Sequence, residues 1–327
     1  MSEPIRRNYD LNGISLAVVA ADQAHAAFLD PILAPLAVAA AAAPGWTIRL
    51  HSSEAIEPPP ANTPRIWHGP LPEGLLSTLV QESDRQVLVV PGHFAMSSVR
   101  SARSTDIQVA AAGAKSIGGT AAFWLLEGIL AAHSRQLLHG ACLVRRATQE
   151  AFALFAPSGT GKTTTALALA RTGLEFAGDD ALVLENTEEG PHLWGIPRKI
   201  KVHRRTADLL PWLRPVLRDW TADEQVIGLD ALDIVIPLAD ATRRRAAGAI
   251  VLLPPNAVDH RVETIAKADA LTQLLTDNVR RAPTGVDADA QAAFTAMARF
   301  VGATPTIALS VGPDPGSLTA AAILSAL

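Results

Sequence analysis

Residues 151–180 constrain this chain most strongly, because the stretch AFALFAPSGTGKTTTALALARTGLEFAGDD combines a phosphate-loop pattern with two adjacent acids. Short apolar runs favour buried strands, whereas Ala and Leu repeated every three or four residues favour a helix. Gly173 stands where a left-handed residue commonly ends a helix. In order, the predicted pieces are a strand at 151–156, a loop at 156–163, a helix at 164–172, a strand at 174–177 and the acid pair at 179–180.

The loop contains the residues that binding of a triphosphate requires. Gly159 and Gly161 carry no Cβ, so the backbone amides can approach the phosphates closely. Lys162 would reach the β- and γ-phosphates, and the Thr163 hydroxyl would bind Mg²⁺. The first position of the pattern, usually glycine, is Ala156, a small residue at the end of the predicted strand. The alternative is a strand-to-helix turn that binds nothing. The residues predicted to bind the nucleotide are Ser158, Gly159, Thr160, Gly161, Lys162, Thr163 and Thr164.

The overall charge narrows the classes of partner. The chain has 327 residues, is 49% hydrophobic and carries a net charge of −4. This length can bury one large core or two moderate ones, and the acidic balance argues against a nucleic-acid partner. The short basic clusters at 100–103 and 243–245 are interpreted as solvated faces or local anion contacts.

The sequence predicts a cytoplasmic protein without a membrane partner. Its single cysteine, Cys142, excludes an internal disulfide and suits a reducing compartment. Residues 1–13 lack the apolar core of a secretory signal. The most apolar stretch, 28–46, is mostly alanine, and Asp30 and three prolines interrupt it, so it is too broken to span a bilayer.

The first 117 residues are predicted to form a small α+β module that recognises a partner or shields the nucleotide site. His51, His68 and His93 are scattered without the spacing of metal ligands and are interpreted as structural or surface residues. The expected elements are strands at 14–20, 46–51, 65–68 and 86–90, a proline-interrupted helix at 25–43, a stiff loop at 57–64 and a hairpin arm at 97–112.

Three elements are predicted between this module and the loop. Residues 118–134 have helical periodicity, and 136–144 (QLLHGACLV) form a strand with His139 and Gly140 in its middle. Residues 145–150 are short and polar, so they make a hairpin into the strand before the loop.

The run LHGACLV, the loop APSGTGKTTT and the segment FAGDD together resemble the catalytic core of the HPr serine kinase family. That family shares its architecture with ATP-dependent phosphoenolpyruvate carboxykinases, and its relatives include tailoring kinases of ribosomal peptide precursors such as lasso precursors. The resemblance implies an α/β fold with a P-loop kinase core at 118–327 behind the α+β module at 1–117. It also implies ATP and Mg²⁺ as cofactors, a protein or peptide as substrate, and a homo-oligomer.

The resemblance also implies a role for each residue of the site. Lys162 would neutralise charge on the transferred phosphoryl group, and Thr163 would hold Mg²⁺. Of Asp179 and Asp180, one would bind the metal and the other would accept the proton of the attacking hydroxyl; which does which stays open. His139 would orient that acid. Phosphoryl transfer needs mostly positioning and electrostatic stabilisation, which suits these groups.

Two expectations about geometry follow from the residues themselves. Adjacent residues on an extended strand point to opposite faces, so Asp179 and Asp180 are expected at a strand end or turn, from which both reach the site. Lys162 is expected on a loop that reaches solvent, so its replacement by alanine should abolish transfer and leave the fold intact.

After the acid pair the sequence predicts more sheet and helix. The glycine-rich segment with an arginine that HPr kinases use for the reverse, phosphorylase reaction is missing, so neither that reaction nor HPr as substrate is expected. Arg198 or Lys199 is a candidate phosphate-facing cation, and 204–219, broken by Pro211 and Pro215, a candidate flap. The other predicted elements are strands at 181–186, 192–196, 233–237, 249–253 and 305–311 and helices at 267–277, 287–301 and 318–327.

Three functions remain open from the sequence. The first is a kinase that phosphorylates a serine or threonine hydroxyl of a protein or peptide. The second is a small-molecule kinase on the same scaffold, and the third a non-catalytic nucleotide switch. The intact set of loop lysine, threonine and acid pair favours catalysis over the third.

Overall fold

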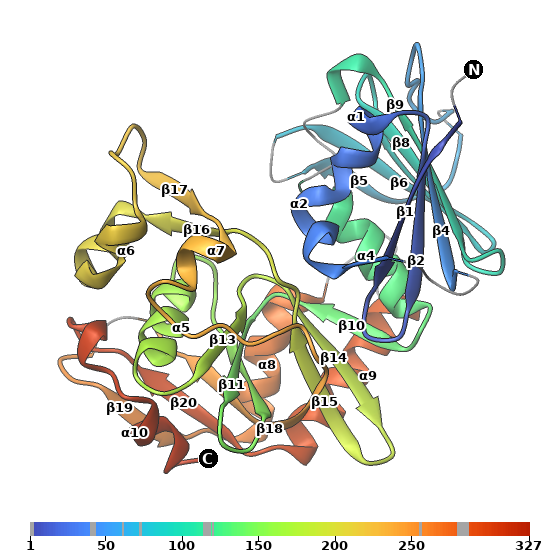
Figure 1. Cartoon of the computed structure of the whole chain (residues 1–327). Coiled ribbons are helices and arrows are strands. Elements are labelled where there is room, and N and C mark those ends of the chain that lie inside the picture. The colour runs from blue at the N-terminus through green and yellow to red at the C-terminus, as the bar shows by residue number, and fades with distance from the viewer. Residues whose placement is uncertain are drawn as a thin grey trace. The chain divides into compact units, whose positions relative to one another are not determined.

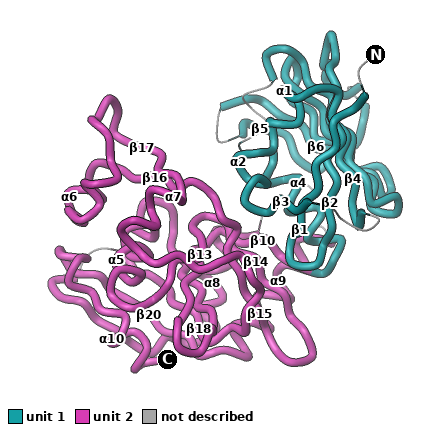
Figure 2. Tube along the Cα trace, viewed as in Figure 1, with its two compact units in different colours: residues 1–134, 281–287 teal, residues 135–280, 288–327 magenta. Residues whose placement is uncertain are grey.

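The computed structural model describes residues 3–39, 44–60, 62–71, 74–113, 119, 121–254, 257–279 and 288–327, and shows a mixed α/β protein with two large sheets (Figure 1). The chain divides into two compact units (Figure 2): residues 1–134 with 281–287, and residues 135–280 with 288–327. The boundary differs from the one expected after residue 117, because helix α4 (Ala122–Ala131) belongs to the first unit.

Unit 1 contains a nine-stranded sheet in the order β3-β1-β2-β4-β9-β8-β7-β6-β5. Strand β4 pairs in parallel with β2 and β9, and the other neighbours are antiparallel. The strands predicted at 14–20, 46–51, 65–68 and 86–90 are confirmed, and the arm at 97–112 falls on the β8–β9 hairpin. The strands are β1 (Ile5–Asp10), β2 (Ser15–Ala20), β3 (Ala37–Val38), β4 (Trp46–Ser52), β5 (Arg65–Pro70), β6 (Leu76–Glu82), β7 (Arg85–Val90), β8 (Phe94–Val99) and β9 (Ser104–Val109).

The single helix predicted at 25–43 is wrong. The structure has two short helices instead, α1 (Gln23–Ala26) and α2 (Asp30–Leu33), each followed by a 3₁₀ turn, and residues 40–43 lie outside the described part. Pro31 and Pro35 occupy the first positions of new turns. A proline cannot donate to the preceding turn, so each one starts a turn rather than continuing a helix.

Unit 2 is built on a second sheet, in the order β10-β14-β15-β18-β12-β11-β13, with β20 beside β18 and β19 beside β20. Strand β18 is parallel to both β12 and β20, whereas the remaining pairs are antiparallel. The strands are β10 (Arg135–Leu138), β11 (Ala141–Arg145), β12 (Glu150–Phe155), β13 (Glu175–Gly178), β14 (Leu182–Thr187), β15 (Gly190–Gly195), β18 (Arg244–Leu252), β19 (Arg261–Thr264) and β20 (Thr306–Ser310).

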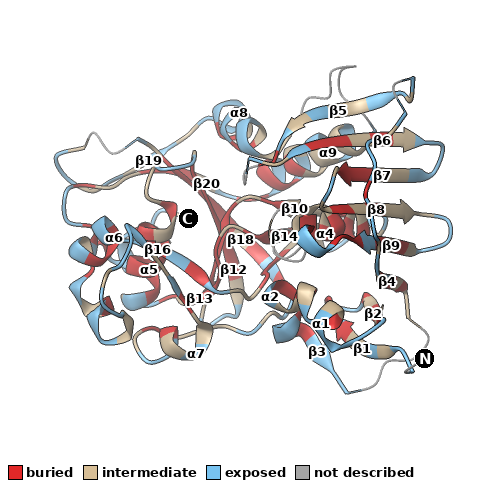
Figure 3. Cartoon of the chain, turned by 90° about the horizontal axis from the view of Figure 1, so that it is seen from above, coloured by how far each residue is buried: buried red, intermediate tan, exposed pale blue. Residues whose placement is uncertain are grey.

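Helices cover both faces of this sheet. Alternate residues of β12 pack on opposite sides: Leu154 belongs to the cluster around α5 (Lys162–Arg171), and Phe155 belongs to the cluster with α8 (Lys267–Asn278) and α9 (Ala288–Ala303). Figure 3 shows the strands between these layers as mostly buried. A strand buried on both faces reads as a continuous apolar run, which is why 151–156 is recognisable in the sequence.

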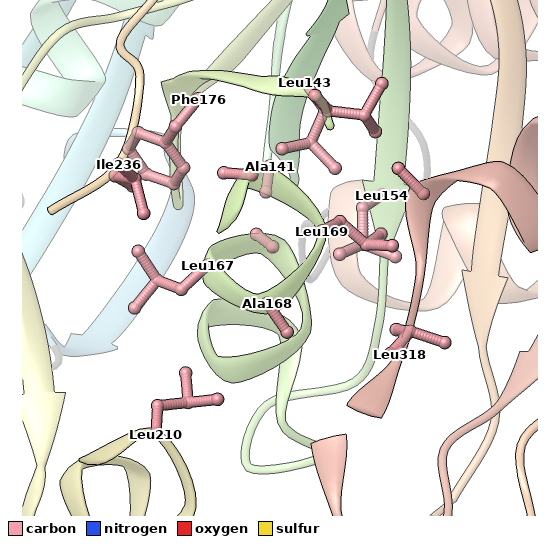
Figure 4. Packing of buried hydrophobic residues seen from close by; sticks show 14 of the residues in the cluster. Ala141, Leu143, Leu154, Leu167, Ala168, Leu169, Phe176, Leu210, Ile236 and Leu318 are labelled. Carbon is pink, nitrogen blue, oxygen red and sulfur yellow. The ribbon is translucent and has the colours of Figure 1, made fainter. Parts of the chain in front are cut away.

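Helix α5 is fixed firmly against the sheet. Figure 4 shows Leu167 and Leu169 of this helix among side chains of β11, β12 and the C-terminal segment. Both leucines are completely buried, and each such side chain contributes about 1.5–3 kcal/mol. The loop that precedes α5 therefore starts from a rigid strand and ends on a rigid helix.

The later part of the chain departs from expectation at two places. Residues 233–237 are not a strand: they follow the short helix α7 (Leu229–Leu232) as a turn. The region predicted as a flap consists of α6 (Arg204–Leu209) and a 3₁₀ turn at Pro211–Val216, flanked by a two-stranded sheet of β16 (Ile200–His203) and β17 (Glu224–Ile227).

The remaining predicted elements of unit 2 are present. The helix predicted at 267–277 is α8 and the one at 287–301 is α9, whose described part begins at residue 288. The chain closes with α10 (Ala320–Leu324). Among the described residues no helix is both long and apolar enough to cross a bilayer.

Candidate active site

The loop between β12 and α5 is shaped by two left-handed glycines. Gly159 has φ of +79° and Gly161 has φ of +102°, and an added Cβ would meet no atom within 4 Å at either position. The requirement for glycine is therefore conformational and not a matter of space. Gly161 is the residue before the first turn of α5, and no side chain caps this helix end. The first amides of the helix remain available to an anion, as in phosphate sites at helix N-termini.

A cavity of about 850 Å³ opens over this loop. Every residue predicted to bind the nucleotide, 158–164, lines it, and His139 and Asp180 line it as well. The opposite wall comes from β16 and α6. The structure therefore places the predicted loop residues, the histidine and one of the two acids around a common space.

The two aspartates follow the end of β13 in a bend. Asp180 has φ of +63°, a left-handed conformation that a non-glycine residue seldom adopts. This bend directs both carboxylates to the same ammonium: Lys162 Nζ lies 2.8 Å from Asp179 Oδ1 and 2.5 Å from Asp180 Oδ1. The pair occupies the strand end that the alternation of side chains led us to expect.

Lys162 does not reach solvent, contrary to expectation. Its side chain is buried, and the two carboxylates enclose its ammonium. Burial alone would lower the pKa of Lys162, but attraction by Asp179 and Asp180 outweighs it and raises the pKa above the ordinary value. The lysine is therefore charged at neutral pH, and its removal would leave buried negative charge behind.

The two acids differ in their surroundings. Asp179 is only 4% exposed and accepts a hydrogen bond from Thr163 Oγ1. The side chain of Asp180 is 41% exposed and faces the cavity. Burial would raise the pKa of Asp180, but Lys162 outweighs it, with help from His139 and Arg198, and the pKa lies below its usual value. Asp180 is therefore ionised at neutral pH and accessible from the cavity.

His139 lies at a break between two strands, not in the middle of one. Residues 135–138 and 141–145 pair with different neighbours, β14 and β12, so the chain bends at His139 and Gly140. A Cβ at Gly140 would lie 2.7 Å from the Leu182 side chain and 3.2 Å from the Leu154 carbonyl oxygen, so this bend fits only glycine well. The bend brings His139 Nδ1 to 3.9 Å from Asp180 Oδ1.

Asn278 holds this bend in place and was not predicted. Its Oδ1 accepts the His139 backbone N–H at 2.5 Å, and its Nδ2 donates to the Leu274 carbonyl oxygen at 2.8 Å. Asn278 stands at the end of α8, far from His139 in sequence, and no local pattern points to it.

The candidate cations further along the chain lie in different places. Arg198 acts electrostatically on Asp180, whereas Lys199 is exposed. Arg244 is buried and its guanidinium binds Asp240, 2.6 Å away, and none of residues 243–245 lines the cavity.

The donor set around the loop suits Mg²⁺. Among the described residues no group of three or more His, Cys, Asp or Glu side chains could hold a metal. Thr163 and Asp179, in contact through their oxygens, and Asp180 beside them offer only oxygen donors. Mg²⁺ in phosphoryl-transfer sites is commonly held by one or two carboxylates and the substrate phosphates, so these residues fit the ion.

Comparison with known proteins gives one distant neighbour. No model of a known protein family matches the chain, and no curated protein matches it. Among solved structures it is similar to the HPr(Ser) kinase/phosphatase from Coxiella burnetii, with 15% sequence identity and a TM-score of 0.27. The match covers 54% of this chain and 81% of that protein. A TM-score this low does not establish a common fold, so the function is argued from the cavity itself.

Proposed function

We propose that this protein is an ATP- and Mg²⁺-dependent kinase that phosphorylates a serine or threonine hydroxyl of a protein or peptide. The supporting observation is the convergence of Asp179 and Asp180 on Lys162 of the glycine loop, beside a cavity lined by the loop. A lysine, a threonine hydroxyl and two carboxylates at a helix N-terminus are the groups that phosphoryl transfer needs for charge stabilisation and proton removal.

The loop would hold the nucleotide. Amides of residues 158–163 and the start of α5 would bind the β- and γ-phosphates, and Lys162 would turn from the acid pair to the γ-phosphate. Thr163 and Asp179 would hold Mg²⁺, which neutralises charge on the phosphates when bound. The existing contact between Thr163 Oγ1 and Asp179 already places these two donors together.

Asp180 would act as the base. It is ionised, half-exposed to the cavity and next to His139, which can orient it. The acceptor oxygen attacks the γ-phosphorus, the bond from that phosphorus to the β–γ bridging oxygen breaks, and ADP leaves. The hydroxyl proton passes to the Asp180 carboxylate. This division of the acid pair rests on the difference in exposure between Asp179 and Asp180.

Transfer of label from ATP tests the proposal. The protein is incubated with γ-labelled ATP, Mg²⁺ and candidate acceptors encoded by neighbouring genes, and mass spectrometry locates the phosphate. We expect label on a serine or threonine, and its loss in Asp180→Asn but not in Glu188→Gln, which removes an exposed carboxylate on the β14–β15 hairpin. Label on a metabolite, or only in inorganic phosphate, would contradict the proposal.

A further inference from the structure

The wall of the cavity opposite the glycine loop is basic. Strand β16 alternates strictly: Ile200 and Val202 are buried in the core, whereas Lys201 and His203 are exposed and line the cavity. Helix α6 continues the wall with Arg204 and Arg205, both exposed and both lining it. Four basic residues from 201 to 205 therefore face one space, in a chain whose net charge is −4.

Two of these four side chains are already engaged. Lys201 Nζ lies 3.1 Å from Glu224 Oε1 on the paired strand β17. The guanidinium of Arg204 lies over the ring of Trp220, 5.5 Å from its centroid. In contrast, the side chains of His203 and Arg205 have no hydrogen-bond or ion-pair partner in the described part of the chain. They are the groups on this wall that can bind something else.

The basic wall is held against the glycine loop. Thr206 of α6 and Thr164 of α5 share a hydrogen bond of 2.9 Å between their hydroxyl oxygens, and both are buried. Arg205 therefore precedes a residue that contacts the first turn of α5. This bond fixes the start of α6 to the loop helix, so the wall has a defined position relative to the phosphates and needs no closure to reach it.

The charge of the wall exceeds what the nucleotide requires. The loop offers its own amides and Lys162 to the triphosphate, and the ligand-free protein already balances Lys162 with Asp179 and Asp180. Besides Asp180, the acid that lines the cavity is Asp223, whose carbonyl oxygen accepts the Arg204 backbone N–H. A cavity of about 850 Å³ lies high in the range of roughly 300–1,000 Å³ for small-molecule sites, so a nucleotide leaves room beside it.

We propose that the wall formed by residues 201–205 binds the acceptor, and that the acceptor is an acidic peptide segment with Asp or Glu beside its hydroxyl residue. This inference rests on the kinase function proposed above. Arg205 supplies a guanidinium fork that matches a carboxylate in two hydrogen bonds, and His203 adds a second donor on the same face. Complementary charge of this kind sets specificity and association rate more than total affinity.

Three synthetic peptides test the inference: a central serine flanked on each side by aspartates, by lysines or by alanines. KM and kcat for each are measured with wild-type protein and with Arg205→Glu. The matched control, Arg299→Glu, reverses a charge on the exposed face of α9. We expect the aspartate peptide to have a KM about tenfold below that of the lysine peptide, and Arg205→Glu to abolish or reverse this preference. Arg299→Glu should keep it.

Binding of Mg·ATP, measured separately by calorimetry, distinguishes the failures. If Arg205→Glu weakens Mg·ATP and leaves the peptide preference unchanged, the wall serves the nucleotide and the inference is wrong. It is also wrong if wild type prefers the alanine or lysine peptide, or phosphorylates a protein acceptor but none of the peptides. If wild type neither binds Mg·ATP nor transfers phosphate to any acceptor, the kinase function itself fails.

Discussion

Replacement of Lys162 should destabilise the ligand-free protein as well as abolish transfer. Lys162→Met keeps the length of the side chain but removes the ammonium that both aspartates contact. The fold was expected to tolerate loss of this lysine as long as it was taken for a solvent-exposed residue. Its burial changes that expectation, because Asp179 would remain buried without a cation.

The size of the effect follows from the burial of the pair. The side chains of Lys162 and Asp179 are 7% and 4% exposed, and removal of one partner from a buried pair costs about 3–5 kcal/mol. Asp180 is 41% exposed, so water can solvate it and it adds little. For a domain of roughly 150–250 residues, each kcal/mol lowers Tm by about 2–4 °C, so the expected decrease is about 6–20 °C.

Thermal unfolding followed by circular dichroism, with EDTA and without nucleotide, measures this decrease. EDTA is needed because a metal ion on the aspartates would replace the lost charge. Lys199→Met, at an exposed lysine of the same unit, is the control and should melt like wild type. The double variant Lys162→Met/Asp179→Asn should recover a large part of the loss, since neither charge remains. The reasoning is refuted if Lys162→Met melts within about 1 °C of wild type, less than one kcal/mol would give.

Three further predictions concern the acid pair, the bend and the cysteine. Asp179→Asn and Asp180→Asn should each lower the rate of phosphoryl transfer about 100-fold or more, through loss of a metal ligand and of the base respectively; full activity in both, in a steady-state assay over a Mg²⁺ series, would mean that the pair is only a turn. Asn278→Leu should lower kcat about tenfold, since a small displacement of His139 is costly, whereas Asn278→Asp keeps the acceptor oxygen and should retain more activity; an equal kcat in the two variants would exclude positioning through the His139 N–H. Burial raises the pKa of the Cys142 thiol to about 12, so at pH 8 it is protonated and should react with Ellman's reagent only on unfolding; rapid labelling of the native protein would contradict its burial.

The sequence predicts the centre of unit 2 well, because that part depends on local patterns. A strand buried on both faces, two glycines before Lys162 and a helix rich in alanine and leucine each leave a signature within a few residues. The turn at Asp179 and Asp180 follows from the same kind of reasoning, since a strand cannot direct adjacent side chains to one place.

The contacts that complete the site are not local, and the sequence does not reveal them. The hydrogen bond from His139 to Asn278 joins residues 139 positions apart. The burial of Lys162 depends on the bend after β13 and on the packing of α5, neither of which is visible in the loop pattern. The break at Gly140 depends on Leu182 and Leu154, which belong to other strands.

The errors elsewhere also have physical causes. The alanine-rich segment at 25–43 has high helix propensity, but its prolines divide it into single turns. Residues 233–237 are apolar enough for a strand, yet Ile236 is buried from a turn while Ile234 is 75% exposed. Periodicity cannot separate these cases in so short a run. Strands β1 and β6 of unit 1 were missed because their stability comes from their neighbours in the sheet.

Hydrogen–deuterium exchange of the loop amides tests the central claim most directly. The claim is that backbone N–H groups of residues 158–163 hold the phosphate tail of a nucleotide beside Asp180. Peptides that cover the loop are compared in the presence of Mg·ATP and of AMP with Mg²⁺, which lacks the β- and γ-phosphates. The account predicts slower exchange of these amides with Mg·ATP and little change with AMP. Equal protection by the two nucleotides, or protection elsewhere with none in the loop, would contradict it.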